Sequence, residues 1–80
     1  MTLDEIYTRD DLVAYIKQLE AEIADKECNW ENKKLEHYLE AMSAWVNDMD
    51  GLYANLNLDM NKEPIWRLFA RILQAATIYE

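Results

Sequence analysis

Few residues in this sequence could carry out nucleophilic chemistry. There is one histidine, His37, one serine, Ser43, and one cysteine, Cys28. A nucleophilic catalyst needs a nucleophile, a base and an orienting group in contact with one another. His37 and Ser43 fall on different faces of the helix that is predicted to contain both. We therefore expect no enzyme, with Cys28 as a structural thiol and His37 as a surface residue.

Two short patterns suggest metal ligands, but both are incomplete. His37 and Glu40 have the spacing of half a carboxylate–histidine site, without a second histidine or paired cysteines to complete it. Residues 48–51 (DMDG) look like part of a calcium loop. The first and last ligand positions of that loop would be Val46 and Asn57, and neither supplies a carboxylate. The sequence therefore predicts no metal site and no cofactor.

Net charge narrows the classes of partner. Sixteen acidic residues against eight basic ones give a formal charge of −8. Because phosphate binding rests on clustered Lys and Arg, we expect no nucleic-acid partner and no anionic membrane surface. The acidity belongs to residues 1–60, and such a field attracts a basic protein partner. The alternative is that the acidity only confers solubility.

The candidate contact residues combine carboxylates with aromatic anchors. Four of the carboxylates are predicted to line one side of the second helix, and a fifth lies just before it. Two tryptophans at the edges of predicted helices could anchor a partner, although a small core also uses large aromatics. The predicted partner-binding residues are Glu31, Glu36, Glu40, Asp48, Asp50, Trp30 and Trp66.

Three helices are predicted from the spacing of apolar residues. The first spans about residues 9–26, with Thr8 as N-cap and Asp11 completing a capping box. Its predicted buried face consists of Leu12, Ile16, Leu19 and Ile23. The second spans about residues 33–49, with Asn32 as N-cap and Gly51 as its stop. Its apolar stripe consists of Leu35, Tyr38, Leu39, Met42, Trp45, Val46 and Met49.

The segment between the second and third helices alternates polar and apolar residues over positions 55–61. We expect a loop that lays Leu56, Leu58 and Met60 on the bundle. The alternative is an edge strand that pairs with a partner chain. The third helix begins near Pro64 and runs to the end of the chain.

These elements predict an all-α fold, a small three-helix bundle with an extended loop between helices 2 and 3. Residues 1–80 are expected to form a single helical domain. The lone cysteine forms no intramolecular disulfide, the first residues lack the pattern of a signal peptide, and no apolar run is long enough to span a membrane. We therefore expect a cytoplasmic protein.

Two groups of residues resemble a family of small bacterial proteins of unknown function. The first group is Trp30-Glu31-Asn32, Leu35-Glu36, Tyr38-Leu39-Glu40-Ala41-Met42 and Ala44-Trp45. The second is Pro64, Trp66, Ala70, Ile72-Leu73, Ala75-Ala76 and Tyr79-Glu80. The resemblance implies a compact bacterial cytosolic domain and brings no catalytic or binding residue. Its glutamates at positions 31, 36, 40 and 80 lack an evident structural role and are candidates for a site.

The leading hypothesis is a non-catalytic acidic protein-binding module. In its most concrete form it is an inhibitor, such as an immunity protein, that masks a basic partner. The alternative is a structural subunit of a bacterial cytosolic assembly that self-associates through residues 55–61, which would make it a homo-oligomer.

Overall fold

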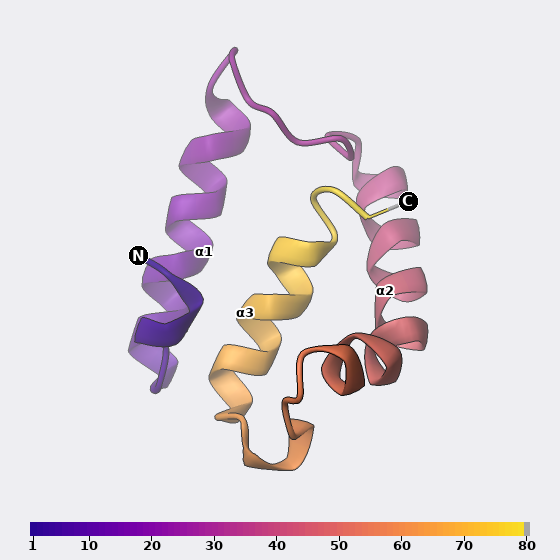
Figure 1. Ribbon diagram of the computed structural model, residues 1–80. Helices are drawn as coiled ribbons and strands as arrows, with labels where there is room; N and C mark the ends of the chain where they lie inside the picture. Colours follow the sequence, from indigo (N-terminus) through magenta and orange to yellow (C-terminus); the bar gives the residue numbers. More distant parts are fainter. Residues whose placement is uncertain (80) are drawn as a thin grey trace.

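The computed structural model describes residues 1–79, and at Met60 the backbone alone. It contains three α-helices, α1 (Arg9–Ala24), α2 (Leu35–Asn55) and α3 (Ile65–Ala75), and two short 3₁₀ turns, η1 (Leu3–Glu5) and η2 (Met60–Lys62) (Figure 1). No strand occurs within residues 1–79. The predicted all-α bundle with a loop between helices 2 and 3 is confirmed.

The three helices lie side by side, with α3 between α1 and α2 (Figure 1). Helix α3 contacts α1, α2 and η1, whereas α1 and α2 make few contacts with one another. The Cα trace measures 36 × 28 × 16 Å, so the molecule is flat. A single layer of three helices leaves two broad faces, and the sequence pattern did not predict which of them would be covered.

The start of α1 follows the predicted capping box. The backbone N–H of Asp11 donates to Thr8 Oγ1 at 3.2 Å, and the N–H of Thr8 donates to Asp11 Oδ2 at 3.1 Å. Backbone donors from Tyr7 and Thr8 lower the pKa of Asp11 below its ordinary value. The helix ends at Ala24, slightly before the predicted position, where Asp25 accepts a bond from the N–H of Glu27 at 3.0 Å.

The main core lies between α1, α3 and η1. It contains Ile6, Leu12, Tyr15, Leu19 and Ala70, with Leu3, Trp30, Trp66 and Leu73 packed against it. Arg67 holds η1 on α3, because its Nε and NH2 groups donate to the carbonyls of Ile6 (3.3 Å) and Asp4 (2.9 Å). The expected burial of Ile16 and Ile23 is wrong: both are exposed. They lie at the edge of the core side of α1, where they line an open groove with Leu19 and with Leu73 of α3.

Helix α2 differs most from prediction. It begins at Leu35 and continues through Gly51 to Asn55, so the predicted stop at Gly51 is wrong. Continuing the helix buries Tyr53, which outweighs the roughly 1 kcal/mol cost of a helical glycine. The stop lies at Asn57, whose φ is 55°. The N–H of Leu58 bonds Tyr53 O at 2.9 Å and the N–H of Asn57 bonds Ala54 O at 3.2 Å, which is a Schellman motif.

The predicted stripe of α2 is only partly buried. Trp45 is buried, but Leu35, Leu39 and Val46 are exposed. Their burial was expected because their spacing matches one helical face. The structure has no second layer of helices to cover that face of α2, since its partner α3 lies beside it.

The loop after α2 is confirmed, but its apolar residues do not cover the bundle. Leu56 and Leu58 are 52% and 44% exposed. The side chain of Met60 lies outside the described part of the chain. Asp59 organises the turn, because its Oδ1 accepts from the N–H of Asn61 at 2.9 Å. The alternating polarity of residues 55–61 arises from a helix end followed by a turn.

Helix α3 begins after Pro64 as predicted, but it ends at Ala75 rather than continuing to the chain end. The chain then turns back toward the linker between α1 and α2. Asn32, predicted as the N-cap of α2, instead donates its Nδ2 to the carbonyls of Ala76 (3.0 Å) and Tyr79 (2.8 Å). Its backbone N–H donates to Thr77 O at 3.0 Å. The amide is therefore used to hold the segment after α3.

Candidate functional site

The exposed carboxylates of α2 are the centre of the predicted site. Glu36 and Glu40 lie one turn apart near the start of α2, where side chains four residues apart are neighbours. Both are exposed, and neither accepts a side-chain hydrogen bond nor joins an ion pair within the described residues. Glu31 is likewise exposed in the linker before the helix. These three carboxylates are therefore free to meet a partner.

Asp48 and Asp50 do not lie together as expected. Both are exposed residues within α2, and positions two apart on a helix point to different sides. The Asp48 carboxylate accepts a hydrogen bond from the hydroxyl of Tyr79, and this bond raises the pKa of Tyr79. Asp48 is thus tied to the segment that follows α3, whereas Asp50 has no such partner among the described side chains. The prediction that four carboxylates line one side of the helix is wrong for this pair.

The two tryptophans of the predicted site are half-buried, and each packs against the main core. Trp30 stacks on Tyr38 with ring centroids 5.8 Å apart, and it packs against the main core. Trp66 also packs against the core and lies tilted against Phe69 at 6.3 Å. Each has a structural role, and their role as anchors stays a prediction. Glu80 lies outside the described residues.

A shallow hollow beside Asp48 contains two of the residues that suggested a metal. His37 and Glu40 line it together with Asn32 and Tyr79, and its volume is about 300 Å³. No group of three His, Cys, Asp or Glu side chains in the described part of the chain is arranged to hold a metal ion.

Sequence reasoning missed a buried polar cluster of Tyr53, Glu63 and Arg71. Arg71 Nε and NH2 donate to Glu63 Oε1 at 3.1 and 2.7 Å, and the guanidinium lies 5.6 Å from the centre of the Tyr53 ring. The Tyr53 hydroxyl donates to Glu63 Oε2. The Glu63 side chain is 7% exposed and that of Arg71 is 19% exposed.

This cluster of Tyr53, Glu63 and Arg71 has a structural role. Burial and the neighbouring Glu63 carboxylate raise the pKa of Tyr53 to about 12. The tyrosine therefore stays neutral, and its hydroxyl donates a hydrogen bond to the carboxylate while keeping the proton. The cluster joins the end of α2 to the start of α3. Its only sequence signal would have been a helix that continues past Gly51, because that continuation places Tyr53 beside α3.

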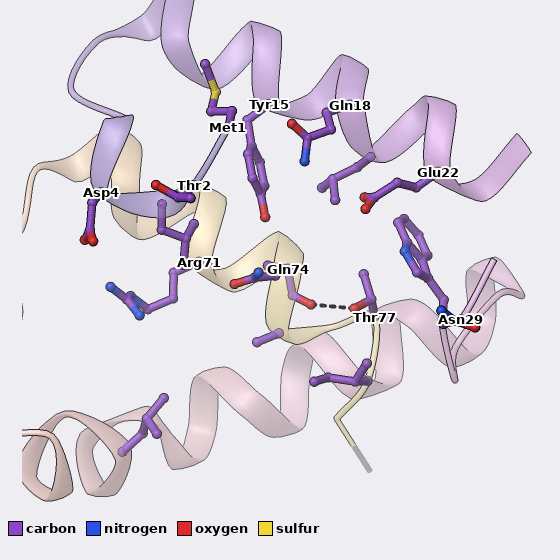
Figure 2. Close-up of a pocket in the computed structure, with 16 residues that line it drawn as sticks. Met1, Thr2, Asp4, Tyr15, Gln18, Glu22, Asn29, Arg71, Gln74 and Thr77 are labelled. Atoms are coloured by element: carbon purple, nitrogen blue, oxygen red, sulfur yellow. Dashed lines mark hydrogen bonds between the residues drawn. The ribbon is translucent and has the colours of Figure 1, made fainter. Parts of the chain in front are cut away.

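A large hollow lies between α1, η1 and the segment that follows α3 (Figure 2). Its volume is about 790 Å³, and Tyr15, Gln18 and Glu22 of α1 face Gln74 and Arg71 of α3 across it. Burial and the nearby Glu22 carboxylate raise the pKa of Tyr15. The single histidine, serine and cysteine of the chain do not line this hollow.

The three packed helices and the net charge of −8 define a small, acidic all-α protein. None of its described helices is both long and apolar enough to cross a membrane. A family model described as a family of unknown function, DUF7660, matches residues 8–80. The chain belongs to this family, and the expected family of unknown function is confirmed. Neither the curated proteins nor the solved structures contain a significant match to the chain.

Proposed function

We propose that this protein is a non-catalytic binding module whose acidic α2 surface masks a basic protein partner, in the manner of an immunity protein or another small inhibitor. The observation that carries the proposal is the pair Glu36 and Glu40, exposed and unpaired within the described residues on the most acidic helix. The proposed setting is a bacterial cytoplasm, which the single free cysteine supports.

Three other acidic residues, unlike this pair, have partners within the described residues. Glu63 is paired with Arg71, Asp11 caps α1, and Asp48 accepts from Tyr79. Glu36 lies in the first turn of α2, where the helix dipole favours negative charge, so it has a structural role as well. Glu40 lies beyond that turn and has none. Electrostatic attraction by such carboxylates speeds association and fixes the orientation of a cationic partner.

A charge-reversal experiment tests the proposal. The tagged protein is used to capture partners from its native lysate at low and at high salt, and affinity for the retained protein is then measured. Glu36→Lys combined with Glu40→Lys should weaken binding about tenfold or more at low salt and flatten the salt dependence.

The matched control is Glu5→Lys combined with Glu27→Lys, two exposed positions on other elements that change the net charge equally. This control should reduce affinity far less than the α2 variant. Equal losses for the two variants would show that only net charge matters. Unchanged affinity and salt slope in the α2 variant would overturn the assignment of the surface.

The alternative, a self-associating structural subunit, was expected to work through an edge strand at residues 55–61. Those residues form a helix end, a turn and the start of η2. Self-association therefore needs another surface, and the exposed apolar side chains of the three helices supply one.

A further inference from the structure

One broad side of the helical layer carries exposed apolar side chains from all three helices. We call this set the apolar face. Its members are Val13, Ile16 and Ile23 of α1, Leu35, Leu39 and Val46 of α2, and Ile65 and Phe69 of α3. Leu35 is 73% exposed and Phe69 is 47% exposed, so these are not marginal cases. Single exposed apolar residues are normal, but a set that crosses three helices calls for an explanation.

A groove shows that the three helices present these residues to the same side. Its volume is about 430 Å³, and its lining joins Ile16 and Ile23 of α1, Leu35 of α2 and Leu73 of α3. The remaining members follow by helical spacing. Val13 is three residues from Ile16, Phe69 is four from Leu73, and Ile65 is four from Phe69.

On α2 the same spacing extends the apolar face over the first half of the helix, as far as Val46. Leu39 is four residues from Leu35, and Val46 is seven further on, which is two turns. The hollow shown in Figure 2 lies on the other side of the layer. Helix α1 lines that hollow with Tyr15, Gln18 and Glu22, which occupy a different sector of the helix from the groove residues Ile16 and Ile23, and Leu19 lies between the two sets. The segment η1 covers that other side and leaves the apolar face open.

The total accessible surface of the chain can be compared with that expected for a monomer of the same mass. A monomeric protein of 9.5 kDa is expected to expose about 5,000 Å². This chain exposes 5797 Å². The excess of about 750 Å² is close to the roughly 800 Å² that each partner contributes to a standard interface. The chain therefore exposes more surface than a compact monomer of its mass, by about the area that one such contact would cover.

Charge indicates which partner fits. The eight members of the apolar face carry no charge, and the groove adds one acid, Glu20, and one base, Lys33. Two copies with a net charge of −8 each repel one another, and an uncharged surface brings the fewest like charges together at the contact. Interfaces between identical subunits are also more apolar than those between proteins that exist separately. An isologous pairing would cover the same face on both copies.

We propose that two copies of this chain pair through the apolar face. The exposed apolar side chains of α1, α2 and α3 in one copy would pack against those of the other. Glu36 and Glu40 belong neither to the apolar face nor to the lining of its groove, so pairing and the binding of a basic partner rest on different side chains. Each can fail without the other.

The experiment measures the mass of the purified protein by sedimentation velocity across a dilution series. The wild type should have twice the 9.5 kDa chain mass at high concentration. Leu39→Lys combined with Phe69→Lys should raise the dissociation constant at least a hundredfold. The control, Leu56→Lys combined with Leu58→Lys, introduces the same charges at comparably exposed apolar residues of the loop and should pair as the wild type does.

Circular dichroism shows whether each variant is folded. If the double variant loses helix, Leu35→Lys takes its place, because Leu35 is the most exposed member and its replacement disturbs the fold least. A wild type that stays monomeric throughout the dilution series overturns the proposal. So does a dimer that forms equally well in Leu39→Lys/Phe69→Lys, or a different protein that occupies the face in the absence of any dimer.

Salt separates this proposal from the proposed function. Because both copies are acidic, added salt should screen their repulsion and tighten the dimer. The same salt should weaken an electrostatic complex with a basic protein. A dimer that dissociates as salt rises would contradict pairing through an uncharged face, whatever happens to the α2 surface.

Discussion

A single amide group, that of Asn32, joins the linker after α1 to the segment after α3. It donates to the carbonyls of Ala76 and Tyr79, and the neighbouring backbone N–H donates to Thr77. These carbonyls lie at and beyond the end of α3, where no helical N–H can reach them. The residue is therefore a clamp between two segments that are far apart in the sequence.

We expect Asn32→Ala to lower the free energy of unfolding by about 1–3 kcal/mol, since two part-buried carbonyls lose their donor. Urea unfolding followed by circular dichroism measures the change. Asn61→Ala is the control, because the Asn61 side chain is exposed and makes no hydrogen bond within the described residues. The role of Asn32 as a clamp would be rejected by equal, small effects of the two substitutions.

The buried hydroxyl of Tyr53 makes stability sensitive to alkaline pH. Its pKa is about 12 in the folded protein, against an ordinary value of 10.0. The folded state therefore holds this proton more tightly than the unfolded chain does. The contribution to stability is complete below pH 10.0 and is lost as the pH rises through about 12.

The free energy of unfolding should thus fall as the pH rises from 10.0 to about 12. The fall should be about 1–2 kcal/mol larger in the wild type than in Tyr53→Phe. Denaturant midpoints measured at a series of alkaline pH values give both slopes. The other tyrosines are common to the two proteins and cancel in the comparison. Identical slopes would show that Tyr53 ionises as readily in the folded state as in the unfolded chain.

At the scale of elements, the end of α2 is the feature that the spacing of apolar residues could not predict. The sequence predicts the end of the helix at Gly51, because glycine commonly follows the last residue of a helix. The structure keeps it inside α2, and no atom lies within 4 Å of the position that a Cβ would occupy. The positive φ that ends a helix occurs later, at Asn57.

We therefore expect Gly51→Ala to stabilise the protein by about 0.5–1 kcal/mol, because alanine loses less entropy in a helix. Asn57→Ala should have the opposite sign, since the left-handed conformation is unfavourable for alanine. Thermal or urea unfolding of the two variants measures both values. If Gly51→Ala were destabilising, Gly51 would be the end of the helix after all.

The elements that could be predicted are those with strong local signals. The capping box at Thr8 and Asp11 fixed the start of α1, and Pro64 fixed the start of α3. The Schellman motif could not be recognised, because Asn57 lies in a segment where polar and apolar residues alternate, and this pattern is also typical of a strand. The ends of helices depend on which distant residues they bury, as Tyr53 shows.

At the scale of the whole molecule, the sequence predicts which residues are apolar but not which of them are covered. A helical stripe is assumed to face a core. Here α3 fills the space between α1 and α2, so the stripe of α2 turns partly to an open side. The same limit applies to the candidate site. Exposed glutamates at positions 36 and 40 could be predicted, whereas the cluster of Tyr53, Glu63 and Arg71 depends on long-range packing.

The central position of α3 also sets the order in which the molecule can form during synthesis. Helices α1 and α2 emerge from the ribosome first, yet each finds its main packing surface on α3 (Figure 1). Until α3 has been made, the nascent chain holds two amphipathic helices without their common partner. The apolar surface of α1 and α2 that packs on α3 stays uncovered until α3 is complete, and transiently exposed surface of this kind makes incomplete chains prone to aggregation.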